Sequence, residues 1–126
     1  MTTVLRPATL PVRNAAPVIS FDRARELAAE FGTPTLAVSR SKLQSVYREM
    51  KSSLPDVDLF YAAKANSDVS ILRTLFLEGS FVDVCSYREM QSALLAGFSP
   101  EQMIHTHPCK TADNTKSCYQ EGLRWF

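Results

Sequence analysis

Apolar positions follow a helical period through the first third of the chain. Between Ser20 and Gly32 they recur every three or four residues, which predicts an amphipathic helix that begins after Ser20 and ends at Gly32. The same spacing from Leu43 to Leu54 predicts a second helix, which ends before a proline. Between the two helices, residues 35–38 form a β-type run, and we expect a short strand there.

From residue 58 onward, short apolar runs alternate with amphipathic segments. The predicted strands are residues 59–63, 81–85 and 103–106, and a fourth strand opens at residues 123–126. The predicted helices begin near residues 69, 87 and 112, and a glycine follows each of them. Strands that start about every 20 residues are typical of successive βα units with a parallel sheet.

This alternation predicts an α/β fold, a partial (β/α)₈ TIM-type barrel. The chain supplies the first three βα units and the start of strand four, preceded by the N-terminal helix and short strand. A complete barrel needs about 250 residues. Because a chain that stops inside an apolar strand leaves an unpaired edge, we expect residues 18–126 to be the truncated N-terminal part of a larger barrel. We expect residues 1–17 to form an irregular arm.

The first of these strands organises the chain. In the stretch DLFYAAKAN, residues 58–66, a continuous apolar run predicts a buried strand with both faces covered. Side chains alternate along a strand, so Phe60, Ala62 and Lys64 are expected on one face. Lys64 then lies at the carboxyl end of the strand, where α/β folds place their functional groups.

Composition excludes some partners. The net charge of +1, from 14 basic and 13 acidic residues, gives no footprint for nucleic acid or an anionic membrane. No apolar run approaches the roughly 18 residues of a membrane span. Residues 1–17 lack the apolar centre of a secretory signal, but contain Arg6 and Arg13 and no acid, so a transit peptide remains an alternative to a disordered arm. The odd number of cysteines, three, predicts free thiols and a cytoplasmic location.

Four motifs occur in order at these predicted elements. They read FGTPTLAV, FYAAKAN, FVDVCSYREM and MIHTHPCK, and GLRWF follows at the fourth strand. Together they run from Phe31 to the end of the chain. This set resembles the N-terminal part of the fold type III pyridoxal-phosphate-dependent ornithine/diaminopimelate/arginine decarboxylases, and is most similar to the ornithine decarboxylase branch.

The resemblance implies an alanine-racemase-like barrel that binds pyridoxal 5'-phosphate. Lys64 would be the lysine that forms the Schiff base with this cofactor, and apolar surroundings favour the neutral amine that this chemistry needs. The implied activity is a carboxy-lyase of polyamine biosynthesis, with ornithine the leading substrate and lysine, arginine or diaminopimelate as alternatives. The family also implies a homodimer. A surface lysine without function is the alternative for Lys64.

Two acids match the family site. The resemblance implies that Asp83 lies near the lysine and the cofactor, although an isolated aspartate at a strand end is as often a turn or cap acceptor. Glu89 matches a second acid, yet the residues from Ser86 to Glu89 form a capping box, in which the glutamate reaches back to the N-cap amide. We favour the cap for Glu89, with a cofactor role secondary.

A metal site is a weaker hypothesis. His105, His107 and Cys109 alternate and suit zinc, but Pro108 interrupts the strand and no fourth ligand is evident. The family often has asparagine before this proline, so the role of His107 is open. We expect no metal here.

The resemblance also implies that several cofactor contacts lie outside this chain. These are a stacking histidine, a glycine-rich phosphate loop, an acid at the pyridine nitrogen and a C-terminal β-domain. We therefore expect the chain to be inactive in isolation. The main alternative is a non-catalytic homologue that associates with a full-length decarboxylase or its regulator. A racemase or cofactor-carrier protein is less favoured, because Ser67 and Asp68 stand where a racemase has tyrosine and glycine.

Overall fold

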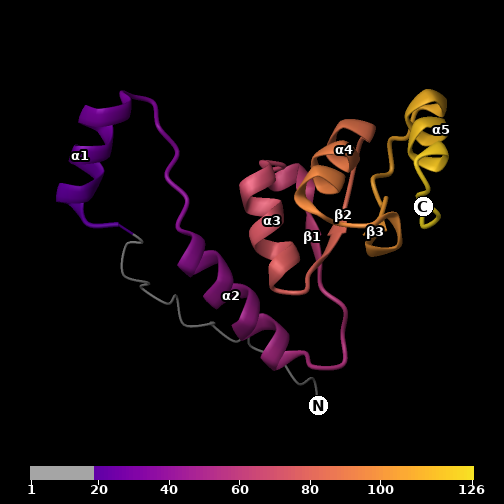
Figure 1. The fold of residues 1–126 in the computed structure, drawn as a ribbon, viewed down its shortest axis with the longest axis horizontal. Helices are drawn as coiled ribbons and strands as arrows, with labels where there is room; N and C mark the ends of the chain where they lie inside the picture. Colours follow the sequence, from indigo (N-terminus) through magenta and orange to yellow (C-terminus); the bar gives the residue numbers. More distant parts are fainter. Residues whose placement is uncertain (1–18) are drawn as a thin grey trace, which may run out of the picture. The chain divides into compact units, whose positions relative to one another are not determined.

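The computed structural model describes residues 19–126, which fall into two compact units that divide between Ala37 and Val38. The first unit contains helix α1, Phe21–Phe31 (Figure 1). Ser20 caps it, since its hydroxyl oxygen accepts a hydrogen bond of 3.2 Å from the backbone of Arg23. Gly32 ends it with a φ of 79°, a conformation that glycine adopts without strain. The predicted helix is confirmed, whereas the predicted arm at residues 1–17 lies outside the described residues.

The short strand predicted at residues 35–38 is wrong. These residues are irregular, and Leu36 is 79% exposed. A strand needs a neighbour for its backbone hydrogen bonds, and none of the strands in the described part of the chain pairs with this segment. A β-type composition without a partner did not produce a strand here.

The second unit contains a parallel sheet with the strand order β1-β2-β3. Its strands are β1 (Phe60–Ala62), β2 (Phe81–Asp83) and β3 (Met103–Ile104). Its helices are α2 (Arg40–Ser53), α3 (Val69–Leu77), α4 (Tyr87–Ala96) and α5 (Ala112–Gln120), with short 3₁₀ helices at Ala63–Ala65 and Pro100–Gln102. Because helices α3 and α4 connect parallel neighbours, these are successive βα units, and the expected partial barrel is confirmed (Figure 1). No helix among residues 19–126 is long and apolar enough to cross a membrane.

The predicted fourth strand is present only as a beginning. Residues 123–126 are not assigned to a strand, but the amide of His105 donates a 2.9 Å hydrogen bond to the carbonyl of Trp125. Leu123 is fully buried. The segment therefore lies beside the continuation of β3, as the βα order requires, and a backbone hydrogen bond joins the two.

The two faces of the sheet differ in burial. In the strand register, Tyr61, Val82 and Met103 are neighbours on one face, and they belong to the core or pack against it. On the other face, Phe60 pairs with Phe81, and their ring centroids lie 5.0 Å apart. Phe60 is 43% exposed, so the expectation of a strand covered on both sides is wrong for β1. Core residues of α3, α4 and α5 pack in the same cluster as the first of these faces, which we call the covered face. The other is the open face.

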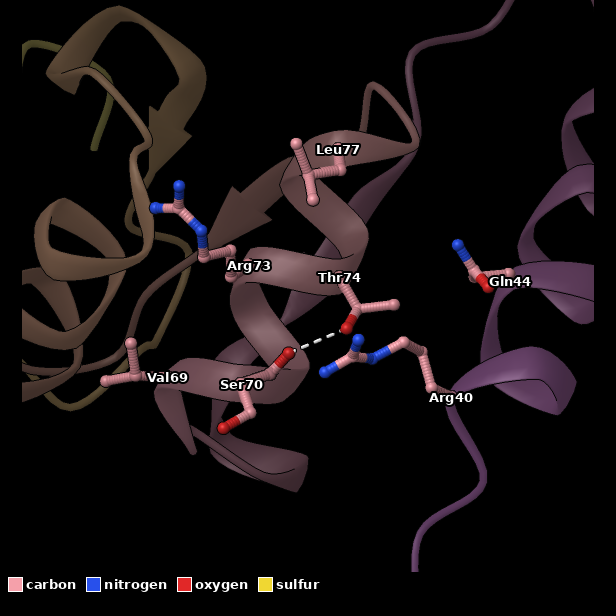
Figure 2. A pocket seen from close by; sticks show the side chains of 7 residues that line it. All are labelled: Arg40, Gln44, Val69, Ser70, Arg73, Thr74 and Leu77. Atoms are coloured by element: carbon pink, nitrogen blue, oxygen red, sulfur yellow. Dashed lines mark hydrogen bonds between the residues drawn. The ribbon is translucent and has the colours of Figure 1, made fainter.

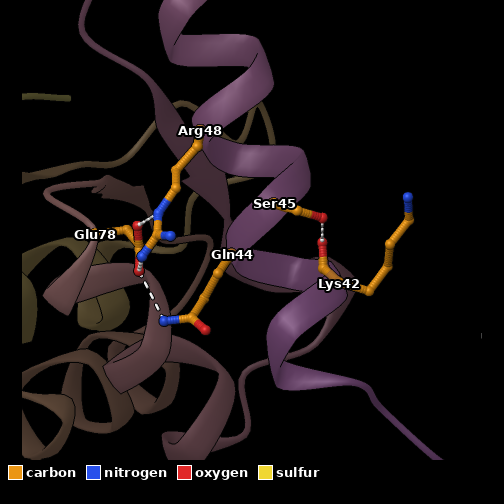
Figure 3. Close-up of polar contacts among 5 residues, drawn as sticks. All are labelled: Lys42, Gln44, Ser45, Arg48 and Glu78. Carbon is orange, nitrogen blue, oxygen red and sulfur yellow. Dashed lines mark hydrogen bonds and ion pairs between the residues drawn. The ribbon is translucent and has the colours of Figure 1, made fainter.

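Helix α2 is fastened to the end of α3 by a carboxylate. Glu78 follows α3 directly, and it accepts hydrogen bonds of 2.7 Å from both Arg48 and Gln44 of α2 (Figure 3). The arginine holds the pKa of this carboxyl below its usual value. This bidentate pair fixes the middle of α2 against the βα unit that contains β1 and β2.

Candidate functional site

Lys64 lies directly beyond the carboxyl end of β1. The strand ends at Ala62, and Ala63–Ala65 form one turn of 3₁₀ helix. Ala63 is buried at 1% exposure, whereas Lys64 is exposed. The regular strand therefore ends before the lysine, so strand alternation alone does not place Lys64 on the face of Phe60, and that placement stays a prediction. A 3₁₀ turn repeats every three residues, so its geometry sets the direction of Lys64.

Polar contacts hold the turn that carries Lys64. The Tyr61 hydroxyl donates a 3.1 Å hydrogen bond to the carbonyl of Asn66, which spans the turn from strand to exit. The side-chain oxygen of Asn66 accepts from the amide of Asp68 at 3.0 Å. Asp68 in turn caps α3 through the amide of Ser70 at 2.8 Å. The lysine is thus placed between a strand and a helix that are both anchored.

Asp83 is the last residue of β2 and is attached to the end of β3. One carboxylate oxygen accepts from the backbone amide of Thr106 at 3.0 Å, and the other accepts from the Thr106 hydroxyl at 2.6 Å. Two bonds to one residue fix the carboxylate plane at the edge where the parallel strands end. Asp83 is thus an acceptor for backbone and side chain, as the alternative interpretation expected. It accepts from the residue beyond β3 and so links the ends of two strands.

Glu89 belongs to the first turn of α4, as the capping motif predicts. The Ser86 hydroxyl oxygen accepts from the amide of Glu89 at 3.2 Å. The Glu89 carboxylate accepts from the amide of Cys85 at 2.7 Å, one residue before the predicted Ser86 amide. The longer reach places this carboxylate beside the residues that follow β2.

The charges of these residues act on the thiol of Cys85, which was not among the predicted site residues. Burial raises the pKa of the Cys85 thiol above its ordinary value, and the charges of Glu89 and Asp83 raise it further. The charge of Lys64 acts on the same thiol in the opposite direction. The position of Cys85 in the sequence could have indicated it, because Cys85 follows the end of β2 as Lys64 follows the end of β1. The charges of Lys64, Asp83 and Glu89 therefore all act on one thiol at the carboxyl edge of the sheet.

The histidines do not form a metal site in the described part of the chain. His105 is fully buried, and its Nε2 lies 3.1 Å from the Asn114 amide nitrogen. The Nδ1 of His107 accepts from the amide of Cys109 at 3.2 Å. Among residues 19–126, no three histidine, cysteine or acidic side chains are grouped as metal ligands.

The second unit has two hollows near its helix α2, and one of them reaches Ala62 and Ala65 beside the turn of Lys64. One, of about 350 Å³, lies between α2 and α3, and Figure 2 shows Arg40 extending from α2 toward the hydrogen-bonded Ser70 and Thr74. The other, of about 360 Å³, is an apolar groove between α2 and β1. Lys64, Asp83 and Glu89 line neither hollow, so the site is an edge of the sheet.

The edge fits a cofactor that is attached through a carbonyl group. The Lys64 amine makes no hydrogen bond or ion pair within residues 19–126, so it is free to react. The carboxylates of Asp83 and Glu89 act on the same thiol as Lys64, and each is held by a backbone amide. Residues 19–126 contain no glycine-rich loop that could form a phosphate cradle. The chain has four glycines, and each follows a helix end.

Comparisons with known proteins agree with this geometry. Residues 40–126 match the family described as "Pyridoxal-dependent decarboxylase, pyridoxal binding domain". A diaminopimelate decarboxylase of Methanothermobacter thermautotrophicus is 32% identical over 79% of this chain and 24% of its own length. A lysine/ornithine decarboxylase of Selenomonas ruminantium is 35% identical over 86% of this chain and 28% of its own length.

The solved structures agree in fold. The lysine/ornithine decarboxylase of Vibrio vulnificus, crystallised with putrescine, superposes with a TM-score of 0.76 at 28% identity. The match covers 85% of this chain and 30% of that one. The chain spans about a quarter of the length of the curated relatives it matches.

Proposed function

This chain belongs to the pyridoxal-dependent decarboxylases, through their pyridoxal-binding domain, and we propose that Lys64 is the residue to which it attaches pyridoxal 5'-phosphate. The observation that carries the proposal is the amine itself. It lies at the carboxyl edge of the sheet, without a partner among residues 19–126, and its charge acts on the same thiol as Asp83 and Glu89. An amine without an ion pair can attack a carbonyl group without first breaking one.

The surrounding residues hold the lysine and set the local charge. The Tyr61 bond fixes the turn of Lys64, and Thr106 fixes Asp83. Glu89 is fixed by the Cys85 amide. Two carboxylates held by backbone amides at the same edge of the sheet can accept a proton during attachment and balance a cationic nitrogen. When bound, the cofactor supplies an electron sink for the pair left as carbon dioxide departs.

The proposed substrate class is a small basic amino acid, with ornithine leading and lysine or diaminopimelate as the alternatives. Support comes from the names of the relatives, which act on lysine, ornithine or diaminopimelate. We further propose that the 126 residues alone do not turn over substrate, because they contain no glycine-rich phosphate loop.

Attachment at Lys64 can be tested without measuring turnover. The chain is mixed with pyridoxal 5'-phosphate, its visible absorption is recorded, and borohydride then fixes any covalent link for peptide mass spectrometry. We expect the label on Lys64 and its loss in Lys64→Ala. Lys110→Ala is the matched control, since Lys110 is an exposed lysine beyond β3. Equal labelling of all lysines, or an unchanged band in Lys64→Ala, would show adventitious reaction and refute the proposal.

One observation favours a second candidate function, association with a full-length decarboxylase or its regulator. Phe60 of the open face is 43% exposed, and exposed apolar surface favours association. Sedimentation of the chain with a full-length decarboxylase tests this candidate. Complex formation that Lys64→Ala leaves unchanged would support it, while independent sedimentation would remove it.

A further inference from the structure

One polar atom of the covered face has no partner. The His105 ring is fully buried, and no hydrogen-bond partner of its Nδ1 is present in the described residues. The ring stacks on Phe126, with centroids 6.0 Å apart at an interplanar angle of 28°. A buried polar atom without a partner carries a cost of desolvation, so its position calls for an explanation.

The contact of the other ring nitrogen, Nε2, determines the tautomer of His105. The amide of Tyr87 can only donate, and it donates a 2.6 Å hydrogen bond to the Asn114 side-chain oxygen. The Asn114 amide group must therefore point the other way, toward the Nε2 of His105 at 3.1 Å. Since this group donates, Nε2 must accept, and the proton of a neutral ring resides on Nδ1. The orientation that Tyr87 imposes on Asn114 therefore makes the unpartnered Nδ1 the protonated nitrogen of the ring.

This chain of bonds ends in the candidate site. Tyr87 is the first residue of α4, and the same turn contains Glu89, whose carboxylate holds the amide of Cys85. We infer that His105, in its neutral Nδ1-protonated form, is a positioning residue that orients the Glu89 turn through Asn114. The part of this inference that concerns the cofactor rests on the proposed function of Lys64.

The inference makes the site sensitive to acid. Protonated His105 would carry a hydrogen on Nε2 and face the Asn114 amide donor to donor, so the link would break. Burial lowers the pKa of His105, and the positive charge of Lys110 lowers it further, with a smaller contribution from His107. Asp83 on β2 acts in the opposite direction. The contacts from α4 and α5 in the link, the Tyr87 backbone amide and the Asn114 side chain, are uncharged.

The sign of the effect follows. Because the folded state lowers the pKa of His105 below its usual 6.5, the neutral ring contributes stability above that pH. This contribution is lost as the pH falls below 6.5 toward the lower value in the folded chain. Nitrogen NMR of the whole chain should find the proton of the neutral ring on Nδ1. A proton on Nε2 at neutral pH would overturn the inference.

Asn114→Asp provides the sharpest variant. Its carboxylate still accepts from the Tyr87 amide, but its second oxygen now accepts from His105, which favours a proton on Nε2 and raises the histidine pKa. Gln120→Glu is the matched control, since it makes the same change on an exposed residue of α5. An unchanged tautomer and pKa of His105 in Asn114→Asp would contradict the inference.

Amide exchange separates positioning from local stabilisation. In Asn114→Ala we expect faster exchange at Tyr87 by about two- to tenfold, the range for one lost hydrogen bond. We also expect faster exchange at Cys85, whose amide is held by Glu89. Faster exchange at Tyr87 alone would mean that Asn114 stabilises one contact and does not position Glu89, and would overturn the inference.

Cofactor attachment to Lys64 is then compared between Asn114→Asp and the wild type from pH 5 to 8. In the wild type, protonation of His105 breaks its link to Asn114, whereas the carboxylate of Asn114→Asp still accepts from the protonated ring. We therefore expect the ratio of labelled variant to labelled wild type to rise as the pH falls. A constant ratio with normal labelling contradicts the inference but leaves the proposed function intact. Absent labelling in both proteins refutes the proposed function, while the exchange experiment still decides the positioning of Glu89.

Discussion

The covered and open faces of the sheet are built from adjacent residues with different tasks. Val82 and Met103 on the covered face are fully buried under helices. Asp83 and Ile104, the next residues along the same strands, pair on the open face and are only half-buried. Alternation along a parallel strand thus separates packing from chemistry by a single position.

The difference teaches where the site can exist. A carboxylate on the covered face would lose its hydration without a partner, whereas Asp83 at the open face keeps solvent access and is still held by Thr106. Lys64 escapes burial differently, by leaving the strand in a 3₁₀ turn. The functional groups therefore lie at the edge where the core ends.

The largest test substitutes neighbouring residues of β3. We expect Met103→Ala to lower the free energy of unfolding by about 2–4 kcal/mol, because it leaves a cavity in the covered face. Ile104→Ala removes a similar volume from the half-exposed face and should cost less than half as much. Urea denaturation of the two variants measures both values. Equal losses would mean that the two faces are equally packed, and the comparison would fail.

A smaller effect is expected at the open edge. Thr106→Val keeps the shape of the side chain but removes the hydroxyl that donates to Asp83, and should cost about 1 kcal/mol. The same substitution in an Asp83→Asn background should cost less, since the charged acceptor is gone. If both backgrounds lose the same stability in denaturation, the bond does not contribute to the link between β2 and β3.

The smallest expected effect reports on charge alone. Glu89 and Asp83 raise the pKa of the Cys85 thiol, and Lys64 lowers it. Glu89→Gln should therefore speed alkylation of Cys85 below its pKa by about two- to threefold, with a smaller gain in Asp83→Asn. Lys64→Met should slow it. Mass spectrometry of the alkylated peptides measures these rates.

The exposed thiol of Cys109 is the internal control for this experiment. Its rate should stay constant in all three variants. A parallel change at Cys109 would point to a global effect on the chain, and would count against the clustering of the three charged residues around Cys85.

The helices were the predictable part of the fold. The bounds of α4 were anticipated because Ser86 begins a capping motif and Gly97, with a φ of 110°, ends the helix. The strand ends were not. In Ala63–Ala65 the sequence suits a strand, a turn or a helix equally, and hydrogen bonding decided for 3₁₀. A run of three or four apolar residues contains no period long enough to separate these outcomes.

The places of Lys64, Asp83 and Glu89 along the chain were predictable, but their contacts were not. The position of Lys64 follows from the end of an apolar run, whereas its proximity to Cys85 depends on the pairing of β1 with β2. The contact between His105 and Asn114 requires α5 to pack over β3, which no local pattern records. Contacts between elements were what the sequence alone could not supply.

The bond from Tyr61 to Asn66 also limits how the chain length can vary. Successive side chains of a strand point to opposite faces, whereas each residue of a 3₁₀ helix rotates the side-chain direction by a third of a turn. The direction of the Lys64 side chain therefore depends on the residue at which the strand changes to the 3₁₀ turn. Inserting or deleting one residue between Ala62 and Asn66 would rotate the lysine and separate the tyrosine from its carbonyl. A change of length in the loops that enter the strands would not rotate Lys64 in this way. The interval from Ala62 to Asn66 is therefore the part of the unit whose length must stay constant.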